Sequence, residues 1–183
     1  MSTTRLDLFD NSAYQPGPLV ARITWTFVSA WFFQTWIPWP NGLKRSLLRA
    51  FGAKVGQGVV VKPRVTIKYP WKLSIGDHCW IGEKVWLDNL GQVTLGNHCC
   101  LSQGALLLCG NHNYKKPTFD LIVGDITLED GVWIGARASV TSGLTCDSHS
   151  VLLMGSTASS NLEARAVYKG NPAVLIRPRK LND

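Results

Sequence analysis

Acidic residues are scarce in this chain of 183 residues: twelve Asp and Glu stand against nineteen Lys and Arg, for a formal net charge of +7. No run of five or six like charges occurs, so the sequence lacks the basic tail typical of nucleic-acid-binding proteins. Hydrophobic residues make up 45% of the chain and charged residues 17%, which is typical of a single globular domain rather than a disordered protein. The basic excess leaves two interpretations open, a solvated surface or a patch that binds a phosphorylated small molecule.

Cysteine is also sparse and lacks any spacing typical of a metal site or a disulfide framework. There are five cysteines, an odd number, and no CxxC pair. We therefore expect reduced, buried thiols in a cytosolic protein. The first residues, MSTTRLDLFDN, lack the basic and apolar order of a signal peptide, which favours the same location. The cysteines are Cys79, Cys99, Cys100, Cys109 and Cys146.

Long apolar runs are absent as well. The most apolar stretch, residues 23–40, has no charge and four of the eight tryptophans, but two prolines close it. A membrane-spanning helix needs roughly 20 apolar residues, so we do not predict one here. Three interpretations remain: a helix that caps the core, an aromatic helix lying in a membrane interface, or a subunit contact. The basic sequence GLKRSLLRAFG that follows keeps the interfacial interpretation open.

One periodic signal is strong. An aliphatic or small residue recurs every six positions along most of the chain, and a glycine often follows it directly. Helices repeat at three and four residues and ordinary strands at two, so neither explains a period of six. Three short strands per coil do explain it, with aliphatic side chains inside a triangular prism and glycines giving the corners backbone freedom. We therefore predict an all-β solenoid. The positions are Val55, Val61, Ile67, Ile75, Ile81, Leu87, Leu95, Leu101, Leu107, Leu128, Ile134, Val140, Cys146, Leu152 and Ala158.

The repeats VGQGVVVKPRV, IGDHCWIGEKV, LGNHCCLSQGA and LEDGVWIGARA resemble those of the hexapeptide-repeat acyltransferases. This resemblance implies a left-handed parallel β-helix over residues 51–174. An N-terminal helical segment, residues 1–50, would cap it, and residues 175–183 would form a basic tail. It also implies a homotrimer with active sites between adjacent prisms, and a mechanism that needs no metal.

The flanking sequences DNSAYQPG and VWLDNL narrow the likeness to the colanic acid biosynthesis acetyltransferases. That resemblance implies transfer of acetyl from acetyl-CoA to a hydroxyl of a saccharide, an exopolysaccharide precursor, on the cytoplasmic side. A lipid-linked acceptor would give the segment 23–40 a purpose at the bilayer surface. Two alternatives stay open: acetylation of a non-sugar hydroxyl, such as that of an antibiotic or serine, and a catalytically inactive scaffold.

The six-residue period breaks once, between Leu107 and Leu128. The extra chain, residues 109–125, cannot fit inside a filled coil, so we expect it to project, as long loops in compact domains usually do for functional reasons. His112 is the one histidine out of phase with the repeat. Histidine titrates near neutral pH, which suits removal of a proton from a hydroxyl. In the acetyltransferases that GNHN resembles, this histidine is the general base, which assigns that role to His112.

Cys109 is an alternative nucleophile. The other histidines, His78, His98 and His149, occupy equivalent hexad positions, and we expect them to have structural roles at a corner, the first two stacked on each other.

The same resemblance implies the remaining site residues. On the acceptor side these are Asp88 and Asn89, which should lie on the same edge as His112 and which otherwise build only a turn. On the donor side, the backbone N–H of Ala136 would stabilise the oxyanion. The full donor set comprises Trp133, Gly135, Ala136, Gly155, Ser156 and Ser159. The CoA phosphates would contact Lys169, Arg177, Arg179 and Lys180, unless these form only a solvated basic tail.

Overall fold

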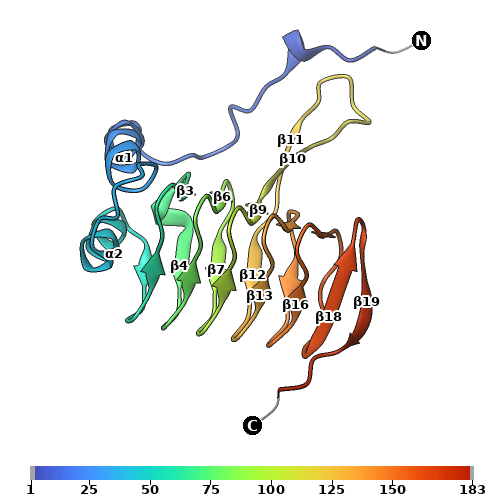
Figure 1. Cartoon of the computed structure of the whole chain (residues 1–183). Coiled ribbons are helices and arrows are strands. Elements are labelled where there is room, and N and C mark those ends of the chain that lie inside the picture. The colour runs from blue at the N-terminus through green and yellow to red at the C-terminus, as the bar shows by residue number, and fades with distance from the viewer. Residues whose placement is uncertain (1–2, 182–183) are drawn as a thin grey trace.

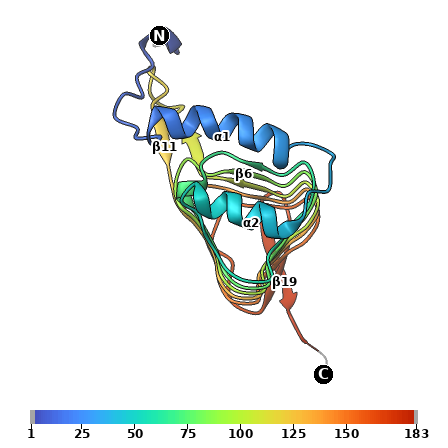
Figure 2. The same cartoon turned by 90° about the vertical axis from the view of Figure 1, so that its left-hand side faces the viewer.

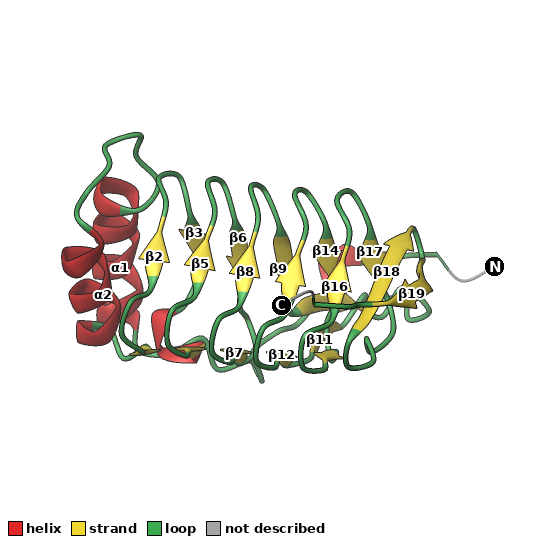
Figure 3. Cartoon of the chain, turned by 60° about the horizontal axis from the view of Figure 1, so that its bottom comes forward, coloured by secondary structure: helices red, strands yellow, loops and turns green. Residues whose placement is uncertain are grey.

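The computed structural model describes residues 3–181 and has a parallel β-solenoid as its main body, as the period of six predicts (Figure 1). Residues 1–2 and 182–183, the ends of the two predicted terminal segments, lie outside the described residues. Short strands stack into three sheets, here called A, B and C, that form the faces of a triangular prism (Figure 3).

Each coil contributes one strand to each face. Sheet A contains β1 (Lys54–Val55), β4 (Leu73–Ile75), β7 (Val93–Leu95), β12 (Ile126–Leu128) and β15 (Thr145–Cys146). Sheet B contains β2 (Val60–Val61), β5 (Trp80–Ile81), β8 (Cys100–Leu101), β13 (Trp133–Ile134), β16 (Val151–Leu152), β18 (Ala166–Gly170) and β19 (Ala173–Pro178). Sheet C contains β3 (Thr66–Ile67), β6 (Trp86–Asp88), β9 (Leu106–Leu108), β14 (Ser139–Val140) and β17 (Thr157–Ala158).

The register of the strands repeats the spacing seen in the sequence. Val55 pairs with Ile75, 20 residues later, and Ile75 pairs with Leu95, again after 20 residues. The next step, from Leu95 to Leu128, takes 33 residues, because an excursion is inserted there. All the residues at the six-residue positions are buried, so the aliphatic period is the inward-facing column of the prism.

The glycines that follow these residues have a different purpose from the one expected. Gly76, Gly82 and Gly135 do not adopt left-handed backbone angles. A Cβ on Gly135 would lie 2.5 Å from the backbone nitrogen of Met154 in the next coil, so these glycines permit close stacking of coils. The left-handed angle falls two residues later. Side chains occupy it at Arg64, His78, Lys84, His98, Arg137 and His149.

Two helices close the N-terminal end, where α2 (Asn41–Ala50) covers the opening of the prism and α1 (Leu19–Phe32) lies across its edge (Figure 2). Trp25 and Phe33 are buried against the core, and the Trp25 indole Nε1–H donates to the carbonyl of Ile67 at 2.8 Å. The buried Lys44 ammonium donates to the carbonyl oxygens of Val61 and Lys62 at 3.0 and 3.3 Å. The capping interpretation of the tryptophan-rich segment is therefore correct for the inner side of α1. Two short 3₁₀ turns, η1 (Leu6–Leu8) and η2 (Pro70–Lys72), complete this end.

At the other end, β18 and β19 form an antiparallel pair connected by a turn with a cis Asn171–Pro172 bond. The boundary predicted at residue 174 falls inside β19, so the start of the basic tail is part of sheet B.

Candidate active site

The insertion between β9 and β12 is an antiparallel hairpin of β10 (Gly110–His112) and β11 (Leu121–Val123), which projects from the prism as predicted (Figure 1). Because β9 belongs to sheet C and β12 to sheet A, the hairpin leaves from the corner between these faces. Its base is fixed by Cys109, whose N–H donates to the carbonyl of Asp88 at 3.2 Å and whose carbonyl accepts from Gly124 at 3.0 Å.

His112 ends strand β10 and is held by the other arm of the hairpin. Its Nδ1 lies 2.9 Å from the carbonyl oxygen of Phe119. A carbonyl can only accept, so Nδ1 carries the proton and Nε2 keeps a free lone pair. The Phe119 ring stacks on the imidazole at 4.4 Å between centroids, and Phe9 packs at 5.7 Å on a tilted angle. The imidazole is therefore fixed in the tautomer that a general base needs.

A pocket of about 330 Å³ opens beside His112. One wall is the N-terminal segment, which runs along the hairpin: the N–H of Arg5 donates to the carbonyl of Pro117 at 2.8 Å. The sequence analysis did not assign this segment to the site. The positions of Phe9 and Asn11, aromatic and polar in an otherwise irregular stretch, were the available signal. The lining residues are Phe9, Asn11, Tyr14, Pro16, Arg22, Lys68, Tyr69, Leu90, His112 and Leu121.

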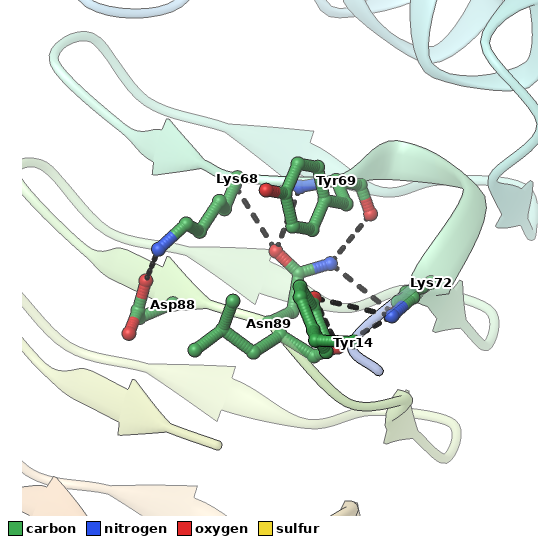
Figure 4. A network of polar contacts seen from close by, with 7 residues as sticks. Tyr14, Lys68, Tyr69, Lys72, Asp88 and Asn89 are labelled. Atoms are coloured by element: carbon green, nitrogen blue, oxygen red, sulfur yellow. Dashed lines mark hydrogen bonds and ion pairs between the residues drawn. The ribbon is translucent and has the colours of Figure 1, made fainter. Parts of the chain in front are cut away.

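The two predicted acceptor residues differ in their surroundings (Figure 4). Asp88 forms an ion pair with Lys68 at 3.0 Å, and Lys68 lines the His112 pocket. Asp88 and Lys68 also line a neighbouring hollow of about 280 Å³ against α1. The pair thus connects the two cavities.

Asn89 is fully buried, and its amide has no polar capacity left for a ligand. Its Oδ1 accepts from the N–H groups of Lys68 and Tyr69, and its Nδ2 donates to the carbonyls of Tyr69 and Lys72, at 2.6–3.2 Å. These four bonds use every donor and acceptor of the side chain. For Asn89 the turn-building alternative therefore replaces the acceptor-binding role.

A second network ties the N-terminal segment to the solenoid. The Tyr14 hydroxyl donates to the carbonyl of Leu90 at 2.8 Å, and the Lys72 ammonium donates to the same carbonyl at 2.7 Å (Figure 4). Lys72 also lies over the Tyr14 ring at 4.5 Å. Burial lowers the pKa of Lys72 and raises that of Tyr14. The wall of the pocket is thus anchored at Tyr14.

The remaining histidines are at corners, as predicted. His78 and His98 stack with their rings 5.3 Å apart and 15° from parallel. His149 occupies the same left-handed position one coil further along.

The thiol of Cys109 is not suited to the alternative nucleophilic role. The side chain is fully buried, and burial raises its pKa to about 11. The thiol is therefore protonated at neutral pH, where a nucleophile would need the thiolate. All five cysteines are free of disulfides.

The predicted donor residues gather partly in a second place. A hollow of about 480 Å³ on sheet B is lined by Trp133 together with Arg177, Arg179 and Lys180. The Trp133 indole N–H donates to Ser102 Oγ at 2.9 Å. Arg179 donates to the carbonyls of Gly131 and His149, so it fixes the chain after β19 as well as lining the hollow.

The other donor candidates lie outside this hollow. The N–H of Ala136 donates to no acceptor within residues 3–181, and it lies at the corner after Trp133. Gly155 and Ser159 are exposed, whereas Ser156 is buried and its Oγ accepts from the N–H of Gly170 at 3.0 Å. Lys169 is exposed on β18. The structure thus unites four of the ten predicted donor residues in one cavity.

Comparison with known proteins identifies the family. No protein-family model matches the chain. The protein named "Putative colanic acid biosynthesis acetyltransferase WcaF" from Escherichia coli K12 is 38% identical over 152 residues, which cover 83% of this chain and 81% of that protein. This chain belongs to the hexapeptide-repeat acetyltransferases, in the branch of WcaF.

Two further relatives of this acetyltransferase are more distant. The galactoside O-acetyltransferase of Escherichia coli K12 is 25% identical, over 76% of this chain and 70% of its own length. The crystal structure of the hexapeptide-repeat acetyltransferase VCA0836 of Vibrio cholerae with acetyl coenzyme A has a TM-score of 0.79 at 22% identity, covering 88% of each chain. The acetyltransferase therefore shares the fold of that enzyme.

Proposed function

We propose that this enzyme transfers acetyl from acetyl-CoA to a hydroxyl of a saccharide, with His112 as the general base. The observation that carries the proposal is the hydrogen bond from His112 Nδ1–H to the carbonyl of Phe119, because it leaves the lone pair of Nε2 for a substrate proton. The fully buried, protonated Cys109 argues for direct transfer rather than an acyl-enzyme.

The proposed step is a single displacement at the thioester. Nε2 of His112 accepts the hydroxyl proton while the acceptor oxygen attacks the carbonyl carbon. The tetrahedral oxyanion is stabilised by the N–H of Ala136. The C–S bond then breaks, and the imidazolium returns its proton to the CoA sulfur.

The polar lining of the His112 pocket supports a saccharide as acceptor. Asn11 and the Lys68–Asp88 pair offer amide, ammonium and carboxylate groups for sugar hydroxyls. The names of the relatives, colanic acid biosynthesis for WcaF and galactoside for the second, point to the same class of acceptor. By this analogy the acceptor is a precursor of an exported polysaccharide, acetylated in the cytoplasm.

The separation of the two cavities supports a homotrimer. His112 projects from the corner between sheets C and A, and Trp133 lies on sheet B, the face opposite that corner (Figure 2). The two cavities share no lining residue, so one chain alone does not bring the donor to the base. If prisms pack side by side, the hairpin of one reaches the donor hollow of the next.

The test is an assay of CoA release with the full chain, acetyl-CoA and a panel of saccharides, with chloramphenicol and serine as non-sugar acceptors. His112→Ala should lower kcat by about 10²–10⁴-fold and leave the Kd for CoA near that of the unmodified enzyme. His78→Asn, at a corner far from the pocket, is the matched control. Near-normal turnover of His112→Ala would refute the role of base. Preference for a non-sugar acceptor would refute the saccharide, and absence of CoA binding would favour a scaffold. Light scattering should give three times the 20.2 kDa chain mass.

A further inference from the structure

The outer side of α1 is apolar and uncovered. Val20, Ile23, Phe27 and Trp31 are spaced by three, four and four residues, so they form one stripe along the helix. They are between 52% and 76% exposed, whereas Trp25 on the opposite side is buried in the core. These four side chains, here called the outer stripe, point away from the solenoid and from every cavity that contains His112.

Two neighbouring features extend this apolar surface. Trp36 and Ile37, just after α1, are also exposed, and Arg64 lies over the Trp36 ring at 4.4 Å. A groove of about 530 Å³ opens between α1 and the start of the solenoid, and Val20 belongs to both the groove and the outer stripe. The groove is lined by Pro18, Val20, Ala21, Thr24, Ala50, Phe51 and Trp71.

The charge around this surface is of one sign. Residues 11–76, which form the helices and the first coil, contain nine Lys and Arg and no Asp or Glu. Only Lys44 among the nine is buried. All twelve acidic residues lie before or after this range. The cations are Arg22, Lys44, Arg45, Arg49, Lys54, Lys62, Arg64, Lys68 and Lys72.

We propose that α1 docks this end of the solenoid on the surface of an anionic lipid bilayer, with the outer stripe at the boundary between headgroups and acyl chains. Tryptophan and phenylalanine are favoured at that depth, and surrounding lysines and arginines are attracted to anionic headgroups. Among the described residues, no helix has the length and apolar content needed to cross a bilayer, so α1 lies in the plane of the surface. A second copy of this end is disfavoured as the partner, because both surfaces carry excess positive charge.

Docking through α1 would bring the acceptor pockets to the bilayer. Arg22 of α1 lines the His112 pocket, and Trp25 and Thr26 line the hollow beside Asp88. An acceptor saccharide carried on a lipid would then meet His112 at the surface. This consequence rests on the proposed function, whereas the docking itself does not.

The experiment is flotation of the full chain with vesicles of phosphatidylcholine, with and without phosphatidylglycerol. The chain should float with the anionic vesicles and less with the neutral ones, and added KCl should weaken its binding. Phe27→Ser/Trp31→Ser should reduce the bound fraction by about tenfold or more, because two large apolar contacts are lost. Tyr114→Ser and Met154→Ser are matched controls, since these residues are as exposed as the stripe but lie elsewhere.

Three outcomes would overturn the proposal. These are no flotation with anionic vesicles, equal flotation of the stripe variant and the unmodified chain, and a stripe variant whose oligomeric mass falls while vesicle binding is unchanged. The last would make the stripe a subunit contact. Acetyl transfer to a water-soluble acceptor should persist in the stripe variant, so a failure of docking is distinguishable from a failure of the proposed function.

Discussion

Phe119 holds His112 in two ways at once, through its main-chain carbonyl and through its ring. The carbonyl oxygen lies 2.9 Å from Nδ1, and the ring stacks on the imidazole 10° from parallel. Phe119 itself has a φ of +54°, a left-handed conformation that costs about 1 kcal/mol or more for a side chain with a Cβ. The turn of the hairpin thus spends backbone strain to present both contacts to one histidine.

Phe119→Gly separates these two contacts. Glycine adopts the left-handed angle without strain and keeps the carbonyl, so the tautomer is preserved while the stacked ring is lost. We expect kcat to fall about tenfold, less than for His112→Ala, with the Kd for CoA unchanged. Phe119→Tyr, which keeps a ring, should restore most of the rate. Unchanged kcat in Phe119→Gly would show that the ring does not position the base.

The adjacent residues Asp88 and Asn89 should respond differently to alanine. Asn89→Ala leaves four buried backbone groups without partners, so the free energy of unfolding should fall by about 3 kcal/mol or more. Asp88→Ala releases Lys68 at the edge of the pocket, so we expect a higher KM for the acceptor with the Kd for CoA unaffected. Urea denaturation and steady-state kinetics on both variants check this contrast. A large stability loss in Asp88→Ala with normal KM would contradict it.

The period of six was sufficient to predict the solenoid, its core and the site of the projecting hairpin, because each inward position is dictated by one repeated contact. The reason given for the glycines was wrong, since close approach between coils depends on three-dimensional stacking. A residue such as Gly135 has the same neighbours in sequence under either explanation, and only the position of Met154 in the next coil distinguishes them.

The N-terminal wall of the pocket could not be predicted for a related reason. Residues before α1 have no period, and their contacts are single hydrogen bonds to distant loops, such as those of Arg5 with Pro117 and Tyr14 with Leu90. The role of Asn89 was equally hidden. Asp and Asn at a turn are chemically similar in a sequence, and burial alone separates a structural amide from an exposed carboxylate.

The basic residues after β18 should bind the phosphates of CoA unequally. Arg177 and Lys180 line the Trp133 hollow without the backbone bonds that occupy Arg179. Arg177→Gln and Lys180→Gln should therefore each weaken CoA binding about fivefold to tenfold, as expected for one lost charge-assisted hydrogen bond, with little change in Tm. Arg179→Gln should lower Tm as well. Arg165→Gln is the control, and calorimetric titration with CoA is the measurement. Equal affinities in all four variants would locate the phosphates elsewhere.

The buried thiols should make the fold sensitive to alkali. Burial raises the pKa of Cys109 to about 11 and that of Cys146 to about 12, both above the ordinary value of 9.0. Because the unfolded chain loses these protons first, rising pH favours unfolding. The contribution is fully present below pH 9 and is lost as pH rises toward the folded-state values.

Between pH 9 and pH 11 each thiol should lower the free energy of unfolding by up to about 1.4 kcal/mol per pH unit. Cys109→Ala/Cys146→Ala should be less stable at pH 7, because the side-chain packing is reduced, but its stability should decline less steeply above pH 9. Urea midpoints measured across this range for both proteins isolate the thiols from other groups that titrate there. Parallel curves, or rapid alkylation of Cys146 in the folded protein, would mean that these thiols ionise without unfolding. In that case the protonated state assigned to Cys109 would fail, and the argument against a cysteine nucleophile would fail with it.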